Sequence, residues 1–287
     1  MHRPLHNLFL IVFLTLPSLS QALPEKALVP GGIALLSMPD YKEGTVVTFN
    51  NEQVAVFPHK KTWIAMAGIP LSAKAGDYEF SIKHHTGITL NSKVTVKTKK
   101  YAEQHLTIKN KRKVNPNAED MKRISKERIR KKKAKALRTD TIPKVDFIWP
   151  TEGRISSIFG LRRFFNEQER RPHNGLDIAA DTGTHVVATA DGTIIDAGNF
   201  FFSGNMIYID HGQGIISLYA HMDRINVKPG DKVKQGQLIG AVGTTGRSTG
   251  PHLHFAVFAN KTLIDPIYML PKRPEPAINK PQIAAKP

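Results

Sequence analysis

The chain has 287 residues, 40% of them hydrophobic, and its formal net charge at neutral pH is +17. That length and hydrophobic content allow one large or two ordinary domains with real cores, and they exclude a disordered protein. The chain has no cysteine, which excludes disulfide bonds and a lipid anchor on an N-terminal cysteine. Its stability in an oxidising compartment must therefore come from packing or a bound metal.

The first residues have the layout of a secretory signal peptide. Arg3 provides a basic start, an apolar run follows from Leu8 to Leu16, and the small-residue pattern Ser20-Gln21-Ala22 closes the segment. We therefore expect cleavage after Ala22, which makes residues 1–22 a signal peptide. The alternative is an uncleaved membrane anchor, but nine apolar residues are too few to span a bilayer. Because no other apolar run has spanning length, we expect a periplasmic or secreted protein with no transmembrane span in the mature chain.

Residues 23–98 are expected to form an N-terminal β domain. Short segments such as GTVVTFN, KTWIAMAGIP and KVTVKT alternate apolar and polar positions or are rich in β-branched residues. Turn signals, among them Pro39-Asp40 and Asn50-Asn51, separate these segments. Short strands at this regular spacing predict a small β-sandwich, and nothing within it looks catalytic.

Residues 99–146 are expected to be a basic helical linker. The stretch VNPNAEDMKRISKERIRKKKAKALR is typical of a helix capped either by Asn115, with Pro116 at the first helical position, or by Asn117. The apolar residues on this helix are few: Met121, Ile124, Ile129 and Leu137. The helix is therefore expected to be a connector that docks lightly or lies across another domain.

Much of the positive charge lies in this linker. Residues 99–138 hold sixteen lysines and arginines against four acidic residues, a net charge of +12. In a cytoplasmic protein such a segment would favour nucleic acid as a partner. Behind a signal peptide, anionic polymers of the cell envelope and membrane surfaces are better candidates, so we expect no nucleic-acid partner. The alternative is a solvated charged helix without a dedicated partner.

Residues 147–270 are expected to form a second β domain, and residues 271–287 a Pro-rich disordered tail. Segments such as THVVATADGTIIDAG, GNMIYIDHG and IISLYAHM are strand-like and end in glycine-rich turns, which leaves little room for a continuous helix. The tail has five prolines in 17 residues, a composition typical of disorder. The whole chain is thus predicted to be mainly β, with two β domains joined by a basic helix.

Two histidine motifs in the second domain point to a metal site. In HNGLD the spacing of four places His173 and Asp177 on one face of a helix or a strand, and Pro172 favours the extended form. In HLH, His252 and His254 share one face of an extended strand. One histidine of that pair would complete a set of three nitrogen and oxygen ligands. A catalytic zinc keeps this number of protein ligands and leaves its fourth position to water.

Hydrolysis also needs a proton acceptor and a stabiliser of the oxyanion. Zinc lowers the pKa of a bound water to about 7 and polarises a carbonyl, but it does not take up the proton. The chain has no H-E-x-x-H motif to supply a glutamate base. The remaining candidates are the second histidine of the HLH pair and His221 in LYAHMD, since neutral imidazole is suited to moving a proton at physiological pH.

About residues 148–270 resemble the lysostaphin-type zinc metalloendopeptidases, also called LytM-domain peptidoglycan hydrolases, in order and without a missing element. The segments that carry this resemblance are RISSIFGLR, HNGLDIAADTGTHVVATADGTI, GNMIYIDHGQGIISLYAHM, VKPGDKVKQGQLIGAVGTTGRSTGPHLHF and DPIYML. In addition, GIPLSAKAGDYEF and LTIKNKRKVNPNAED are similar to a β-rich N-terminal domain that precedes this domain in some Gram-negative members. In that setting the N-terminal domain can bind, position or occlude the catalytic groove.

The resemblance implies how the histidines divide the work. His173, Asp177 and His254 would bind one zinc ion (Zn2+) per chain on the floor of a groove in an antiparallel sheet. His221 and His252 would be catalytic, one as general base and the other as stabiliser of the tetrahedral intermediate. The sequence leaves open which of the two takes which role.

The same resemblance implies a hydrolase of the bacterial cell wall. The expected activity is that of a secreted zinc metalloendopeptidase that hydrolyses peptide cross-links or stem peptides of peptidoglycan, with a zinc-bound water as nucleophile. The D-alanyl–diaminopimelate link is the expected bond in a Gram-negative host. Arg162 in FGLR and Asn205 in GNMIYIDHG match family positions that contact substrate or shape the groove, with a structural role as the equal alternative. The expected partners of this monomeric chain are peptidoglycan and a regulatory protein.

Two alternative functions belong beside this one. A catalytically silent regulator would activate a cell-wall amidase through the same fold, and it predicts a missing ligand or base. All five positions are filled in this chain, which weighs against it. An autolysin for pentaglycine bridges would share the chemistry and differ only in the groove, and neither the signal peptide nor the N-terminal domain favours it.

Overall fold

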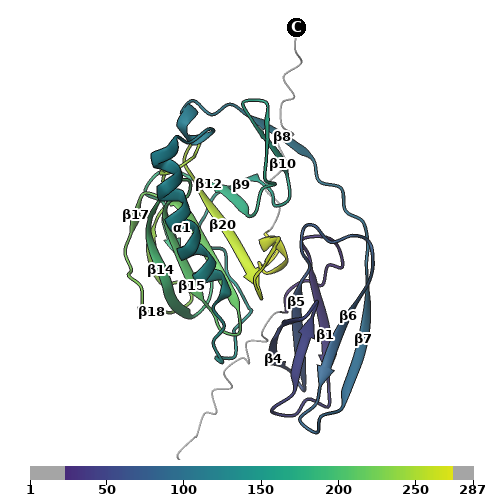
Figure 1. Ribbon diagram of the computed structural model, residues 1–287. Helices are drawn as coiled ribbons and strands as arrows, with labels where there is room; N and C mark the ends of the chain where they lie inside the picture. Colours follow the sequence, from purple (N-terminus) through teal and green to yellow (C-terminus); the bar gives the residue numbers. More distant parts are fainter. Residues whose placement is uncertain (1–22, 274–287) are drawn as a thin grey trace, which may run out of the picture.

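The computed structural model describes residues 23–273, and the expected signal peptide and most of the expected tail lie outside this range. Within it the chain is mainly β, as predicted, with one α-helix, α1 (Ala118–Ala136), and two short 3₁₀ segments, η1 (Lys111–Lys113) and η2 (Pro266–Tyr268). Two groups of strands lie side by side with α1 across one of them (Figure 1). Among the described residues, no helix combines the length and the apolar character needed to cross a membrane.

The N-terminal strands form two small sheets that face each other as a sandwich. One sheet has the order β1 (Ile33–Met38), β5 (Thr62–Gly68), β4 (Ala55–His59). The other has the order β3 (Glu52–Gln53), β2 (Val46–Phe49), β6 (Gly76–Lys83), β7 (Thr89–Val96). Residues of both sheets share one buried cluster, in which the rings of Phe49 and Phe80 lie 4.8 Å apart. The alternating pattern of the sequence therefore gives the predicted sandwich, because each sheet buries its apolar face against the other.

The C-terminal strands form a large antiparallel sheet. Its order is β18 (Lys232–Val233), β14 (Gly192–Phe200), β15 (Gly204–Asp210), β16 (Ile215–Met222), β20 (His252–Ala259), β12 (Leu176–Ala179), β9 (Arg154–Ser157), with β21 (Thr262–Ile264) paired to β20. A smaller sheet consists of β13 (His185–Val187), β19 (Leu238–Ala241) and β17 (Arg224–Ile225). Residues from both sheets belong to one buried core, so one face of the large sheet is covered by the smaller one.

Alternation along β20 decides which face carries the histidines. Leu253, Phe255 and Val257 belong to the core shared with the smaller sheet. Ala256 and Phe258 belong to a separate buried cluster on the opposite face, together with Ala134 of α1. Because side chains two residues apart point to the same face of a strand, His252 and His254 lie on the face that α1 covers further along.

The linker is more structured than its composition suggested. α1 begins after Asn117, whose side chain accepts from the backbone N–H of Asp120 while the Asp120 carboxylate accepts from the N–H of Asn117. This capping box selects Asn117 over Asn115 as the cap. Before it, β8 (Glu103–Leu106) pairs in parallel with β10 (Arg162–Phe165), which pairs with β11 (Gln168–Arg170). This short strand was not predicted.

The two β regions share a buried interface at the end of β20 that is remote from His252. Ile33 and Met66 of the sandwich belong to the same core as Val257 of β20. A backbone donor on the edge of β4 also finds its acceptor across this interface, since the N–H of Val56 donates to Gln213 Oε1 at 2.8 Å. The body of the sandwich therefore lies away from the histidines, and the linker strand β8 is the part that returns toward them.

Candidate active site

Three predicted ligands bring their donor atoms together at the start of β20. Asp177 on β12 is the cross-strand partner of His254 on β20, and His173 lies just before β12. Asp177 Oδ1 lies 2.9 Å from His173 Nε2 and 2.7 Å from His254 Nδ1, and the two nitrogens are 3.1 Å apart. All three residues are buried or nearly so. The extended form of the HNGLD motif and the register of two strands thus produce one triangle of donors.

The donor set fits zinc by chemistry and by spacing. Two imidazole nitrogens and one carboxylate oxygen are ligands that zinc prefers, and metal bonds of 2.0–2.2 Å place tetrahedral ligands about 3.3 Å apart. The observed separations are slightly shorter than that. His173 Nδ1 is 2.7 Å from the carbonyl oxygen of Ile158, so its N–H donates there and Nε2 presents its lone pair to the triangle. Among the described residues, this is the one group of three such side chains close enough to hold a metal.

Asp177 is held in its ionised form. Burial by itself raises the pKa of this carboxyl, but hydrogen bonds and the charges of His173 and His254 outweigh it and keep the pKa well below its usual range. Its second oxygen, Oδ2, accepts from Arg163 Nη2 at 2.8 Å. Arg163 also donates to Ser157 Oγ and to Gln104 Oε1 of β8. The carboxylate therefore offers one oxygen to the triangle while an arginine holds the other.

His221 and His252 stand beside the triangle as a pair of neutral imidazoles. Their ring centres are 4.9 Å apart, and the ring centre of His221 is 6.0 Å from that of His254. His252 Nδ1 lies 2.8 Å from the carbonyl oxygen of Gly250, and His221 Nδ1 lies 2.7 Å from that of Thr245. Since a carbonyl accepts only, each Nδ1 carries the proton and each Nε2 is a free acceptor.

Burial keeps both rings unprotonated at neutral pH. It lowers the pKa of His221 to about 3, with further lowering from the charges of His252 and His254. Burial also lowers the pKa of His252, although the charge of Asp177 opposes that shift. A neutral imidazole with a free nitrogen can accept a proton during a reaction, and it becomes a hydrogen-bond donor once it has done so. The pair can therefore supply both functions that the triangle lacks.

Backbone geometry fixes the two histidine-bearing segments. His221 has a φ of +63°, an uncommon conformation for a residue with a side chain, and its N–H donates to the carbonyl oxygen of Ser203 at 2.9 Å. Gly175, inside HNGLD, packs so closely on β20 that a Cβ there would lie 2.7 Å from Cε1 of His254. The glycine is needed for this close approach of backbone to ring, not for its φ.

The two residues predicted to contact substrate lie outside this group. The guanidinium of Arg162 is half exposed and bonds to Glu103 and Glu169. Asn205 donates through its backbone N–H to Thr245 Oγ1, the residue whose carbonyl holds His221. Their proposed roles stay predictions. The sequence analysis did not single out Arg163. A signal was present, because Arg163 directly follows Arg162 in the segment FGLRR.

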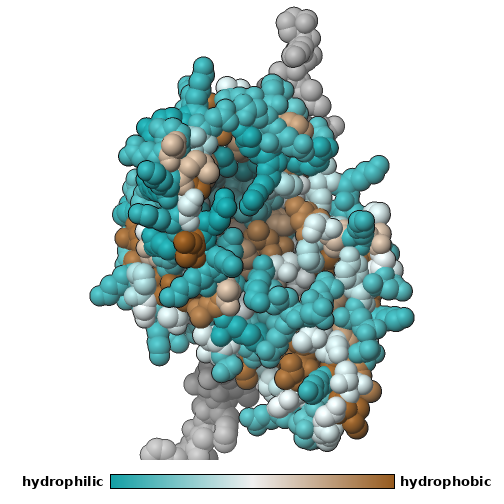
Figure 2. All heavy atoms as spheres, in the orientation of Figure 1, coloured by the Kyte–Doolittle hydropathy of each residue, from teal (hydrophilic) through white to brown (hydrophobic). Residues whose placement is uncertain are grey.

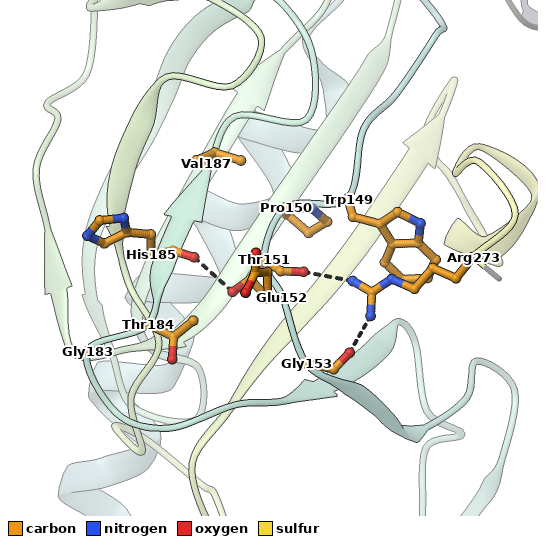
Figure 3. A pocket seen from close by; sticks show the side chains of 10 residues that line it. All are labelled: Trp149, Pro150, Thr151, Glu152, Gly153, Gly183, Thr184, His185, Val187 and Arg273. Carbon is orange, nitrogen blue, oxygen red and sulfur yellow. Dashed lines mark hydrogen bonds between the residues drawn. The ribbon is translucent and has the colours of Figure 1, made fainter. Parts of the chain in front are cut away.

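A cavity of about 830 Å³ opens elsewhere on the domain and contains none of the residues discussed above (Figure 3). Its lining includes Trp149, Glu152, His185 and Arg273. The guanidinium carbon of Arg273 lies 3.7 Å from the centre of the Trp149 ring, and its nitrogens donate to the carbonyls of Thr151 and Gly153. Arg273 and the Thr151 hydroxyl bond to backbone carbonyls of the lining, and none of the predicted ligands and catalytic histidines lines this cavity. The triangle and its two histidines therefore remain the candidate site.

Comparisons with known proteins identify family profiles that match both β regions. The profile named Peptidase family M23 matches residues 171–266, and the profile named Peptidase family M23 N-terminal domain matches residues 26–97. Residues 171–266 include the triangle and both neutral histidines. The boundaries expected from the sequence for the two β domains stay predictions.

Three relatives illustrate the range of the similarity. The crystal structure of a Pseudomonas aeruginosa protein assigned to peptidase M23 aligns with a TM-score of 0.71 and 33% identity, covering 84% of this chain and 94% of that one. The peptidoglycan DD-endopeptidase ShyA of Vibrio cholerae is 45% identical over 112 residues, which are 39% of this chain and 25% of ShyA. The murein hydrolase activator NlpD of Escherichia coli is 38% identical over 126 residues, which are 44% of this chain and 31% of NlpD.

The match to the curated relatives is thus partial, since the chain spans about a quarter to a third of their length. The match to the P. aeruginosa structure is different, because it covers 84% of this chain and nearly all of that chain. Together with the profile that contains the donor triangle, this similarity shows that the chain belongs to peptidase family M23.

Proposed function

We propose that this protein is a zinc metalloendopeptidase that hydrolyses peptide cross-links or stem peptides of peptidoglycan. One observation carries the proposal: three donor atoms that suit zinc lie on the same sheet face as two neutral histidines with free Nε2 atoms. A binding module would need neither the second histidine pair nor its fixed tautomers. The expected bond is the D-alanyl–diaminopimelate link, which agrees with the DD-endopeptidase activity named for ShyA.

Each residue of the site has a role that its contacts support. When bound by His173, Asp177 and His254, zinc would activate water and polarise the scissile carbonyl. One of His221 and His252 accepts at its free Nε2 the proton from the attacking water. The other stabilises the oxygen that gains negative charge, and it donates to that oxygen once it has itself taken up a proton at Nε2. Arg163 keeps the Asp177 carboxylate in place through Oδ2. Binding of the substrate peptide along the face that bears the histidines would complete the arrangement.

The second candidate function is that of a silent regulator that activates a cell-wall amidase. The similarity to NlpD, a murein hydrolase activator, favours it. The filled site argues against it, because a regulator has no need for five residues in these positions. In either case we propose that the protein acts on the cell wall outside the cytoplasm and works as a monomer, with peptidoglycan and a regulatory protein as partners.

A digestion experiment separates the two candidates. The chain from residue 23 onward would be incubated with purified sacculi and with soluble cross-linked muropeptide dimers, alone and with a cell-wall amidase added, and products identified by mass. We expect the protein alone to convert dimers to monomers and a chelator to stop the conversion. Products that appear only with the amidase, or an unchanged dimer at full zinc occupancy, would refute the endopeptidase proposal.

The outward face of α1 is proposed as a contact for the acidic polymer. Many of the basic residues in 111–138 are engaged within the protein, such as Arg130 with Asp196 and Arg123 with Glu127. Six basic residues, one just before α1 and five on it, have exposed side chains that form no ion pair or hydrogen bond in the described part of the chain: Lys111, Lys122, Lys126, Arg128, Lys132 and Lys133. Figure 2 shows mainly hydrophilic side chains over α1. A field of unpaired cations attracts a polyanion such as peptidoglycan with its carboxylates.

Replacing Lys122, Lys126 and Lys133 together by glutamine is expected to weaken binding to sacculi at low salt by about threefold or more, since each exposed pair contributes about 0.2–1 kcal/mol. Hydrolysis of soluble dimers should stay unchanged, because the side chains of these residues are exposed and bond to no residue of the triangle or the histidine pair. The matched control replaces Lys42, Lys60 and Lys61, which are exposed on the sandwich, and removes the same charge. Equal binding losses for the two triple variants in a co-sedimentation assay would exclude a dedicated surface on α1.

A further inference from the structure

We propose that Glu127 of the linker helix is a positioning residue for His221, acting through the turn at residues 201–203. The inference rests on the proposed function, because it assigns His221 a part in hydrolysis. It adds that the helix between the two β domains is a working part of the peptidase site and not only a connector. The argument follows one chain of contacts from α1 to the imidazole.

Glu127 holds the beginning of the turn that joins β14 to β15. Its side chain is buried, and both carboxylate oxygens lie 2.9 Å from the backbone nitrogen of Phe201, whose N–H donates to them. Arg123, one helical turn earlier, donates through Nε to Glu127 Oε1 at 2.7 Å. A buried carboxylate that accepts a backbone N–H and is paired with an arginine forms a strong, directional contact. α1 thus fixes the position of Phe201.

Two further basic residues of the linker hold the same turn. Lys131 Nζ donates to Ser203 Oγ at 3.0 Å, and burial lowers the pKa of this lysine to about 8. Lys113 Nζ lies 3.8 Å from the centre of the Phe201 ring and donates to the Phe201 carbonyl oxygen. The turn is therefore held at both ends by one rigid helix and the segment before it.

The same turn fixes the position of His221. The carbonyl oxygen of Ser203 accepts the N–H of His221 at 2.9 Å, at the residue whose φ is +63°. A left-handed conformation at a residue with a side chain persists only where its surroundings impose it. The neighbouring carbonyl, that of Phe202, accepts the N–H of Arg247 at 2.8 Å and so fixes the loop that contains Thr245. The backbone of His221 and the carbonyl that orients its ring thus both depend on this turn.

The donor triangle does not depend on it. His173, Asp177 and His254 lie on or beside β12 and β20, and their side-chain hydrogen bonds run to one another, to Ser157, to Ile158 and to Arg163. Releasing the turn should therefore disturb His221 and leave zinc binding intact. This selectivity separates a positioning role from a general loss of structure.

The test compares Glu127→Ala with Glu127→Gln and with an outward control on the same helix, Glu119→Ala, whose side chain is exposed, on soluble muropeptide dimers. We expect Glu127→Ala to lower kcat about 10- to 100-fold, the effect of a small misplacement of a catalytic group, with KM and zinc content unchanged. Glu127→Gln keeps an acceptor for the Phe201 N–H and should retain most of the activity. Glu119→Ala should match the wild type. Lys131→Ala, which releases Ser203, should show a smaller effect of the same kind if Glu127→Ala folds poorly.

A double-mutant cycle gives the decisive result. In a His221→Ala background, Glu127→Ala should cause no further loss of kcat, because the group that it positions is gone. The same fold loss in both backgrounds, or a loss of zinc from Glu127→Ala, would overturn the inference.

Two readouts test the inference without hydrolysis. Glu127→Ala should speed amide hydrogen exchange at Phe201 and His221 and shift the ring signals of His221 in the NMR spectrum, whereas Glu119→Ala should do neither. Unchanged exchange and ring signals would overturn the positioning role even in an active protein. A wild type that cleaves no dimer would instead refute the proposed function, while the exchange and ring signals would still decide the contact chain.

Discussion

Replacing His254 by alanine is expected to abolish both zinc binding and hydrolysis, whereas replacing His252 is expected to abolish hydrolysis and leave zinc bound. The two histidines are two residues apart on one strand face, yet only His254 Nδ1 belongs to the donor triangle, at 2.7 Å from Asp177 Oδ1. His252 Nε2 is 3.9 Å from that oxygen, and its Nδ1 is engaged with the Gly250 carbonyl. We therefore expect His252 to act on the substrate and not on the metal.

The measurement is zinc content per chain after dialysis, paired with the rate of dimer cleavage. His254→Ala should retain less than a tenth of the wild-type zinc, as should His173→Ala, because two remaining ligands bind weakly. His252→Ala should keep about one zinc and lose about 10²- to 10⁴-fold in rate, the usual contribution of a general acid or base. If His252→Ala loses its zinc, or if His254→Ala keeps it, the division between the two histidines is wrong.

The sequence predicted the contents of this site because the motif spacing carries geometry. The spacing in HLH predicts that His252 and His254 share one face of any strand that contains them, and β20 is that strand. HNGLD left a helix and a strand open, and the structure has Asp177 on β12. The role of His254, as opposed to His252, came from resemblance to a family. The cross-strand register between Asp177 and His254 gives that choice a physical basis.

Features that depend on distant backbone were beyond the sequence. The carbonyls of Gly250 and Thr245 set the tautomers of His252 and His221, and no side-chain pattern marks a carbonyl. The strand β8 has four residues, too few to show an alternation of apolar and polar positions. It forms because it pairs with β10, which lies 59 residues later in the sequence. Arg163 has its role only because the same pairing brings β8 and its Gln104 beside the site.

The linker helix shows that residue content alone did not predict how the helix docks. Its few apolar residues indicated a connector that docks lightly or lies across another domain, and its high charge left a solvated helix as the alternative. In the structure, charge is also the means of docking, since the cation of Arg130 lies 4.5 Å from the Phe200 ring centre and pairs with Asp196. Ile129, one of the few apolar residues, is instead 71% exposed. A hydrophobic pattern identifies a buried helix face only when apolar contacts make the interface, and here many of the contacts are made by basic side chains.

Replacing Gly175 by alanine is expected to lower zinc affinity about 10- to 100-fold although no donor atom is removed, as for other changes that misplace a metal ligand. A Cβ at this position would lie 2.7 Å from Cε1 and 2.8 Å from Nε2 of His254, and 2.5 Å from the carbonyl oxygen of Phe255. The carbonyl belongs to the middle of β20 and cannot move without breaking the sheet. The imidazole must therefore shift, and its Nδ1 leaves the triangle.

Gly250→Ala is the matched control for this change. Gly250 lies two residues before His252, has no left-handed φ, and a Cβ there would meet nothing within 4 Å. Both variants add one methyl group near the histidine strand, so a titration with zinc followed by dimer cleavage should give wild-type values for Gly250→Ala and losses of both for Gly175→Ala. Equal zinc affinity in the two variants would mean that His254 does not occupy the ligand position. In that case the close packing of Gly175 on β20 would serve the sheet and not the metal.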